Sequence, residues 1–142
     1  MKKLSLVLLL VLAAVPALAQ KKIIHPPEFR SGTPFSPGVL IDGTLYVAGQ
    51  TGSDLKTNQF PANFADEARA CLDRIGIILK AGGMGFSDVA SVTVYLTDIS
   101  LFQQMNEVYT TYFKTDRPAR ATVQVAGLVG AAKIEIVAIA RK

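Results

Sequence analysis

The chain alternates short apolar segments with polar or glycine-rich connections, and the spacing inside each segment predicts its secondary structure. Apolar residues on both sides of Asp42-Gly43 predict a β-hairpin, because this dipeptide is typical of a two-residue turn between paired strands. Residues 89–96 alternate β-branched and aromatic residues and are therefore also predicted to be a strand, and two later segments are predicted to be strands as well. The predicted strands cover residues 39–41, 45–48, 89–96, 119–126 and 133–140.

Two segments have the three-and-four spacing of apolar residues that is typical of an amphipathic helix. The first covers residues 61–81 and is followed by Gly82-Gly83, which favours a C-terminal cap. The second begins at Asp98 or Ser100, either of which can cap a helix, and runs to about Phe113. These two helices complete the pattern of predicted elements.

The predicted order is β-β-α-β-α-β-β, an α+β arrangement of a mixed sheet with both helices on one face. The last strand is apolar on both sides. The residues that alternate along it are Ile134, Ile136 and Ala138 on one side and Val137 and Ile139 on the other. This pattern predicts a central strand in a sheet whose second face is also covered. In so small a chain we expect that cover to come from self-association.

The first 19 residues differ from the rest in composition, because 15 of them are apolar. Lys2 and Lys3 precede an apolar run from residue 4 to residue 15, and Ala17-Leu18-Ala19 provides a small-x-small cleavage pattern. The run is shorter than the roughly 20 residues that a spanning helix needs. We therefore expect a cleaved signal peptide at 1–19, a single domain at 20–142, and a periplasmic or secreted protein without a stable membrane anchor. The alternative is an uncleaved anchor.

Charge and composition narrow the range of partners and cofactors. The formal net charge is +4, and it falls to +2 without Lys2 and Lys3, while the other basic residues are scattered. We therefore expect no nucleic-acid partner. Cys71 is the only cysteine and His25 the only histidine, so an intrachain disulfide is excluded and a metal site or a Cys–His nucleophile pair is disfavoured. Cys71 lies in the apolar stripe of the first helix and is expected to be a buried, inert thiol.

Three polar residues interrupt apolar patterns, and buried polar groups are costly unless they are paired or used. Glu135 is a single carboxylate inside the last strand, Arg120 opens the strand before it, and Asn106 borders the apolar stripe of the second helix. In one interpretation, Glu135 and Arg120 form a structural ion pair across an interface, and Asn106 is a helix-flank hydrogen bonder. In the functional interpretation, Arg120 binds a substrate carboxylate, Glu135 positions or activates a water, and Asn106 adds a hydrogen bond.

From Pro34 to Lys142 the chain resembles the reactive intermediate deaminase (Rid) family, also called YjgF or L-PSP proteins. The matching stretches are Pro34-Phe35-Ser36-Pro37, Leu45-Tyr46-Val47-Ala48-Gly49-Gln50, residues 89–98, Asn106-Glu107-Val108-Tyr109, Arg117-Pro118-Ala119-Arg120 and Lys133-Ile134-Glu135-Ile136. The resemblance implies a chorismate-mutase-like α+β fold and a homotrimer with sites between subunits. It also implies hydrolysis of 2-imino acids, or their enamine tautomers, to 2-oxo acids and ammonia without a metal or cofactor.

The resemblance also implies a role for individual residues. The family's carboxylate-binding arginine falls on Arg120 and its water-orienting glutamate on Glu135, so these two are the expected catalytic residues. Its helix asparagine falls on Asn106, and its strand-end glycine falls on Gly49. The small residue two positions after the arginine falls on Thr122. All of these except Glu135 are expected to contact the 2-imino or 2-oxo acid.

Three departures from the family pattern bear on substrate range, and one of them is Thr122, where some members have cysteine. Phe35, which is also expected to line the substrate site, stands where many members have tyrosine, and Ala48 stands where serine is common. Two other functions are alternatives to deamination. One is a non-enzymatic trimer that binds small carboxylates or acts as a holdase. The other is RNA cleavage, which the single histidine and the low charge disfavour.

Overall fold

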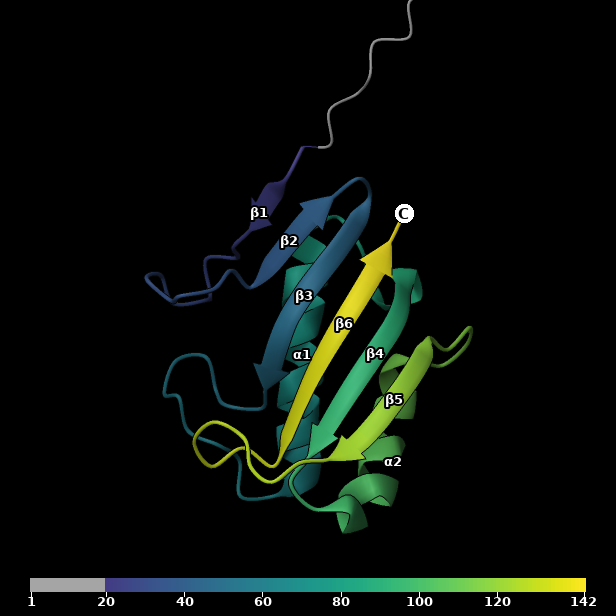
Figure 1. Ribbon diagram of the computed structural model, residues 1–142. Helices are drawn as coiled ribbons and strands as arrows, with labels where there is room; N and C mark the ends of the chain where they lie inside the picture. The colour runs from purple at the N-terminus through teal and green to yellow at the C-terminus, as the bar shows by residue number, and fades with distance from the viewer. Residues whose placement is uncertain (1–19) are drawn as a thin grey trace, which may run out of the picture.

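The computed structural model describes residues 20–142, so the signal peptide expected at 1–19 lies outside the described residues. Within this range, two helices cover one face of a six-stranded sheet with the strand order β1-β2-β3-β6-β4-β5 (Figure 1). The elements in chain order are β1 (Lys22–Ile24), β2 (Gly38–Ile41), β3 (Thr44–Thr51), α1 (Phe64–Ala81), β4 (Val89–Leu96), α2 (Phe102–Tyr112), β5 (Ala119–Gln124) and β6 (Ile134–Arg141). Short 3-10 helices precede β4 and α2.

The α+β fold class agrees with the prediction, and so does the central place of β6. This strand pairs antiparallel with β3 on one side and β4 on the other, while β4 and β5 pair in parallel. The predicted hairpin is formed by β2 and β3, and both Asp42 and Gly43 have positive φ at their turn. Strand β1 was not predicted, because three residues are too few to show an alternating pattern.

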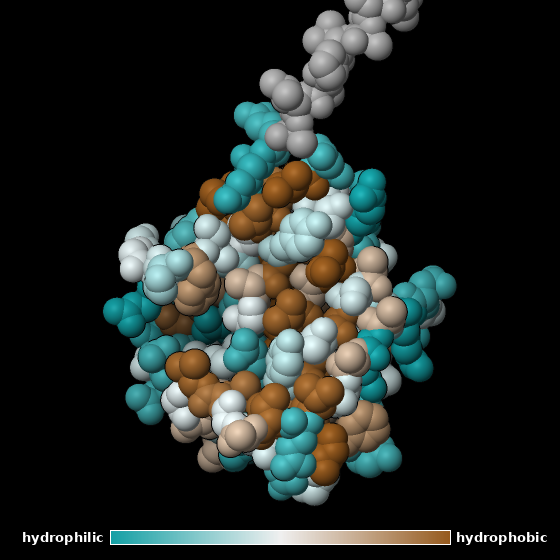
Figure 2. Space-filling view, in the orientation of Figure 1, coloured by the Kyte–Doolittle hydropathy of each residue, from teal (hydrophilic) through white to brown (hydrophobic). Residues whose placement is uncertain are grey.

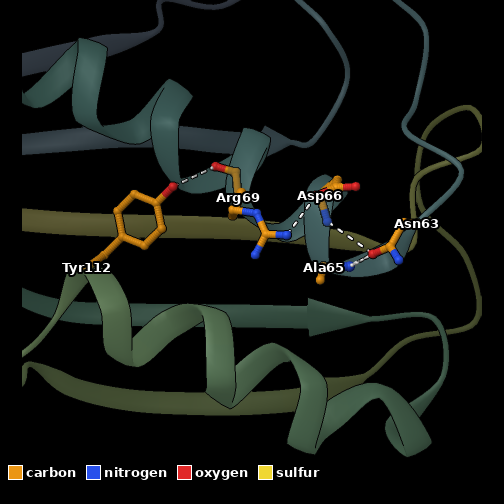
Figure 3. A network of polar contacts seen from close by, with 5 residues as sticks. All are labelled: Asn63, Ala65, Asp66, Arg69 and Tyr112. Carbon is orange, nitrogen blue, oxygen red and sulfur yellow. Dashed lines mark hydrogen bonds and ion pairs between the residues drawn. The ribbon is translucent and has the colours of Figure 1, made fainter.

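Helix α1 begins three residues later than predicted because Asn63 caps it. The Asn63 side-chain oxygen accepts hydrogen bonds from the backbone N–H groups of Ala65 and Asp66, at 2.8 and 3.4 Å (Figure 3). Further along α1, the hydroxyl of Tyr112 from α2 lies 3.3 Å from the carbonyl oxygen of Arg69. These contacts fix the start of α1 and its position against α2.

Two other predicted boundaries also moved. Helix α2 begins at Phe102, because Asp98 caps the preceding 3-10 turn instead and accepts a hydrogen bond from the N–H of Ser100. The strand predicted at 119–126 ends at Gln124, where β5 loses its partner β4. Neither change alters which face of its element a candidate site residue occupies.

Cys71 confirms the predicted buried stripe of α1. The helix packs on β3 and β6, and the Cys71 side chain is fully buried in that layer. Its Sγ donates a hydrogen bond to the carbonyl oxygen of Gln50 at 2.9 Å. Burial raises the pKa of this thiol far above its ordinary value, so the reactive thiolate is strongly disfavoured.

The second face of the sheet is apolar and partly exposed. Successive side chains point to opposite faces of a strand, so the residues between the buried ones lie on this face. Tyr46 and Val123 are 49% and 42% exposed there. A row of directly paired residues crosses four of the strands: Ile23, Val39, Tyr46 and Ile139. Figure 2 shows apolar side chains gathered along the middle of this face. Residues 20–142 therefore do not provide the second cover expected for β6.

Candidate active site

The predicted site residues, except Thr122, are distributed between two cavities of this chain. A cavity of about 480 Å³ is lined by Phe35, Gly49 and Glu135 among others. A second cavity, of about 430 Å³, is lined by Asn106 and Arg120 among others. We call them the Glu135 cavity and the Arg120 cavity. We call the predicted residues at each cavity a half-site.

Glu135 owes its position to a glycine on the neighbouring strand. The register between β3 and β6 shifts between Val47 and Gln50, and Gly49 lies within this bulge. A Cβ atom at Gly49 would overlap Oε1 of Glu135, so only glycine leaves room for the carboxylate. The Glu135 side chain is half-buried and forms no hydrogen bond or ion pair with another described residue. Its oxygens are therefore available to a water or a ligand.

A second carboxylate, on α1, fixes the start of the strand that carries Glu135. Glu67 is completely buried, and its Oε1 accepts hydrogen bonds from the backbone N–H groups of Lys133 and Ile134 at 2.7 and 3.4 Å. Gly52 packs against Glu67 so closely that a Cβ there would overlap the Glu67 carbonyl oxygen. Glu67 therefore acts on the site as a positioning residue, through the backbone of β6.

Arg120 is held on several sides within its own chain. Its Nη2 donates to the side-chain oxygen of Asn106 at 2.8 Å. Its Cζ lies 4.5 Å from the ring centroid of Tyr109 and 5.7 Å from that of Phe102. Rings at these distances stabilise a guanidinium through cation–π attraction. The arrangement orients a charged, planar group toward the Arg120 cavity, where it can bind a carboxylate through two parallel hydrogen bonds.

Two hydroxyl groups beside Arg120 have no hydrogen-bond partner among the described residues. They belong to Tyr109, which lines the Arg120 cavity, and to Thr122, which lines neither cavity. Burial raises the pKa of Tyr109, although the nearby Arg120 charge opposes this. Tyr109 was not predicted as a site residue, although it stands in a stretch that matches the family pattern. The available signal was its spacing, three residues after Asn106 on the same helix face.

Arg120 and Glu135 lie on opposite faces of the sheet. Arg120 is paired with Val92, whose side chain is in the core under the helices. Glu135 is paired with Tyr95 on the face without helices. The ion pairs among the described residues are Arg69–Asp66 and Lys142–Asp88. Within one chain the two predicted catalytic residues therefore neither pair nor share a cavity.

Two further arginines line the Glu135 cavity and were not singled out from the sequence. Arg74 comes from α1, and Arg30 comes from the connection between β1 and β2. The signal for Arg74 was weak: it lies three residues after Cys71 and borders the buried stripe of the helix. Among residues 20–142 there is no group of three histidine, cysteine, aspartate or glutamate side chains placed to hold a metal ion. No helix in that range is long and apolar enough to cross a membrane.

Comparison with known families places the chain in one of them. The family described as endoribonuclease L-PSP matches residues 27–142. The chain therefore belongs to this family, the YjgF or Rid family expected from its motifs. Crystal structures of two Escherichia coli proteins share the fold: TdcF with bound serine, at 34% identity, and the YjgF gene product, at 33%. Each aligns with a TM-score of 0.81 over 85% of this chain and 98% of the other.

Closer relatives in sequence carry a more specific name. The rat protein named 2-iminobutanoate/2-iminopropanoate deaminase is 48% identical over 107 residues, which are 75% of this chain and 78% of the relative. The human protein of the same name is 45% identical over 108 residues, or 75% of this chain and 79% of the relative. Both names describe imine deaminases, the enzyme class that the motifs of this chain imply.

Proposed function

We propose that this protein hydrolyses 2-imino acids, or their enamine tautomers, to 2-oxo acids and ammonia. The observation that carries the proposal is the Arg120 guanidinium, held by Asn106 and two aromatic rings and aimed at a cavity. Such a group suits the carboxylate that all 2-imino acids share. The names of relatives at 45–48% identity support the same reaction.

We also propose that the working form is a homotrimer whose sites lie between subunits. Arg120 and Glu135 cannot serve one ligand from a single chain, because they lie on opposite faces of the sheet. A neighbour packed on the open apolar face could bring its Arg120 to the Glu135 cavity, since β5 is the edge strand. The same packing would cover Tyr46, Val137 and Ile139. Size-exclusion chromatography with light scattering measures the subunit number directly.

The main requirement of the reaction is that the enzyme positions the substrate and the attacking water, because an imine carbon is already electrophilic. Arg120 binds the substrate carboxylate, and Glu135 orients a water against the imine carbon. Glu135 accepts a proton from the water as its oxygen bonds to that carbon, and it returns this proton to the imine nitrogen, which gives a neutral carbinolamine. Glu135 then carries the hydroxyl proton to the same nitrogen as the carbon–nitrogen bond breaks, so that ammonia leaves and the carbonyl of the 2-oxo acid forms. In this scheme no step uses a metal.

The place of action stays a proposal based on the N-terminal segment. Residues 1–19 have the basic start, apolar run and small-residue cleavage pattern of a signal peptide, and we propose a periplasmic or secreted mature protein. The intact mass of the protein recovered from the periplasm or medium tests this. A mass that still includes residues 1–19 would contradict it.

The central test generates defined imines with an amino-acid oxidase and measures how fast each one disappears. We expect Arg120→Ala to lower kcat/KM by about a hundredfold or more, since a lost charge-assisted contact leaves the substrate carboxylate unpaired. Arg117→Ala is the matched control and should keep most of the activity. Arg117 also lines the Arg120 cavity, but its Nε donates to the backbone carbonyl oxygen of Phe113. Unchanged activity in Arg120→Ala would overturn its role. Saturable binding of 2-oxo acids without imine turnover would favour the non-enzymatic binder.

A further inference from the structure

Arg74 is a charged group of the Glu135 cavity that the deamination scheme does not use. It is half-buried on α1, and its Nε donates to the side-chain oxygen of Gln50 at 3.1 Å. Its Nη1 donates to the carbonyl oxygen and hydroxyl of Ser53 at 3.0 and 3.3 Å. Its Cζ lies 5.2 Å from the ring centroid of Phe29. The guanidinium therefore has one preferred orientation at the cavity wall.

The charge of Arg74 is not neutralised within the described chain. No described carboxylate lies within ion-pair distance of it, and its Nη2 forms no hydrogen bond with a described residue. Asp54 is the acidic side chain that most favours its charge, but Asp54 Oδ1 already accepts hydrogen bonds from its own turn. Burial lowers the pKa of Arg74, as expected when a cation is withdrawn from water without a partner. An unpaired, half-buried cation beside a cavity is typical of a site for an anion.

The cavity can hold two recognition points for one ligand. Its volume of about 480 Å³ lies in the range of small-molecule sites. Gly49 and Glu135 form the part where water would attack, and Arg74 lines the same cavity from a different element. Phe29 and Leu55 provide apolar wall. A ligand with an apolar chain and a second negative charge fits this set of groups.

We propose that Arg74 binds the distal carboxylate of dicarboxylic 2-imino acids, which are the imines of acidic amino acids. The inference rests on the proposed deamination, because Arg120 of a neighbouring subunit holds the carboxylate next to the imine. Arg74 is then a specificity-determining residue, and Gln50 and Ser53 hold it in place. It takes no part in the attack on the imine carbon.

The test compares two stable 2-oxo acids of equal chain length. 2-Oxoglutarate and 2-oxopentanoate both have five carbons, and only the first has a distal carboxylate. Calorimetric titration of the purified protein should give a Kd about tenfold or more lower for 2-oxoglutarate, as expected for one added charge-assisted contact. Equal affinities in the wild-type protein overturn the proposal without any variant.

Variants then locate the preference. Arg74→Gln should reduce it to about twofold or less and leave the Kd of 2-oxopentanoate within about twofold, while Arg74→Lys keeps part of it. Arg30→Gln is the matched control, because Arg30 lines the same cavity but is exposed. If Arg30→Gln loses the preference for 2-oxoglutarate as completely as Arg74→Gln does, the preference comes from the overall positive potential of the cavity. If Arg74→Gln weakens the binding of both ligands equally, Arg74 has a structural role. Either result overturns the proposal.

Turnover separates this inference from the proposed function. Imines made from glutamate and from norvaline by the matching oxidases differ in the same distal carboxylate. If both are hydrolysed at equal kcat/KM, deamination stands and the role of Arg74 falls. If neither is hydrolysed but 2-oxoglutarate is still preferred through Arg74, the binding site stands and deamination falls.

Discussion

The two half-sites hold their charged groups in different ways. Arg120 is fixed by side chains of its own chain, through the hydrogen bond that it donates to Asn106 and through the rings of Phe102 and Tyr109. Glu135 has no side-chain partner among the described residues. Its carboxylate is positioned by the backbone, because Gly49 has no Cβ to occupy its place and the pairing of β6 with β3 sets its position along the sheet. The guanidinium of Arg120 is therefore preorganised to bind a carboxylate group. The Glu135 half-site leaves its carboxylate free for a water, which suits the part of the site where bonds change.

This difference means that each half-site is incomplete in a different way. In the proposed reaction, the Arg120 half-site provides the group that binds the substrate carboxylate, and the Glu135 half-site provides the base. The proposed interface between subunits would bring the two groups to one substrate. The following experiments test that division, in order of expected effect.

The largest effect is expected from mixing two inactive variants. Arg120→Ala and Glu135→Gln should each lower kcat/KM by about a hundredfold or more, because each removes the essential group of one half-site. If each site takes Arg120 from one subunit and Glu135 from the next, co-expression in equal amounts should restore about a quarter of the wild-type activity, since a quarter of the sites are then intact. The measurement is imine hydrolysis by the mixed oligomer. No recovery would contradict a site that takes Arg120 from one subunit and Glu135 from the next.

A large effect on the Glu135 half-site alone is expected from one methyl group. Gly49→Ala places a Cβ where the Glu135 carboxylate now lies, so the carboxylate must move. We expect kcat to fall by about a hundredfold, the loss that a misplacement of about 1 Å can cause. Gly127→Ala is the control, because a Cβ there meets no atom within 4 Å. Wild-type activity in Gly49→Ala would show that the position of the carboxylate does not matter.

A smaller effect is expected when the Arg120 half-site loses its hydrogen bond. Asn106→Ala should raise KM about tenfold with little change in kcat, because a hydrogen bond to a charged group contributes about 1.5–3 kcal/mol and the two rings still orient the guanidinium. Gln103→Ala, at an exposed position of the same helix, is the control. A fall in kcat with unchanged KM would instead indicate that Asn106 acts on the bond-changing step.

The sequence pattern predicted several residues of both half-sites, but it did not predict how they are arranged in space. Arg120, Asn106 and Glu135 were singled out because each interrupts an apolar pattern, and each lies on the strand or helix predicted for it. Gly49 was assigned only through the family resemblance, because its function depends on a bulge that shifts the register between β3 and β6. Periodicity does not reveal a bulge.

The sequence pattern also could not predict which residues line each cavity. Arg74 belongs to the Glu135 cavity because α1 crosses behind β3, and Gln50 and Ser53 then hold its side chain. No spacing in the sequence relates residue 74 to residues 50 and 53. Strand β1 was missed, and both helices were predicted to begin too early, for a similar reason. Short strands and capping side chains act through contacts rather than through periodicity.

The smallest effect separates the ring of Tyr109 from its hydroxyl. The ring lies 4.5 Å from Arg120 Cζ, whereas the buried hydroxyl has no partner among the described residues. Tyr109→Phe should keep kcat/KM within about twofold and change the free energy of unfolding by less than about 1 kcal/mol, because no hydrogen bond is lost. Tyr109→Leu removes the cation–π contact and should raise KM a few-fold, as a loss of about 1 kcal/mol predicts.

The pH profile adds an independent readout for the same residue. Burial raises the pKa of Tyr109, so its hydroxyl stays protonated through neutral pH and loses its proton only in strongly alkaline solution. Substrate KM should therefore show no step from Tyr109 between about pH 6 and pH 9, and the KM profile of Tyr109→Phe should match that of the wild type. If Tyr109→Phe is as damaging as Tyr109→Leu, or removes a step from the profile, the hydroxyl contacts the substrate or a neighbouring subunit. Arg120 would then share the binding of the carboxylate with a second donor, and the Arg120 half-site would not be complete within its own chain.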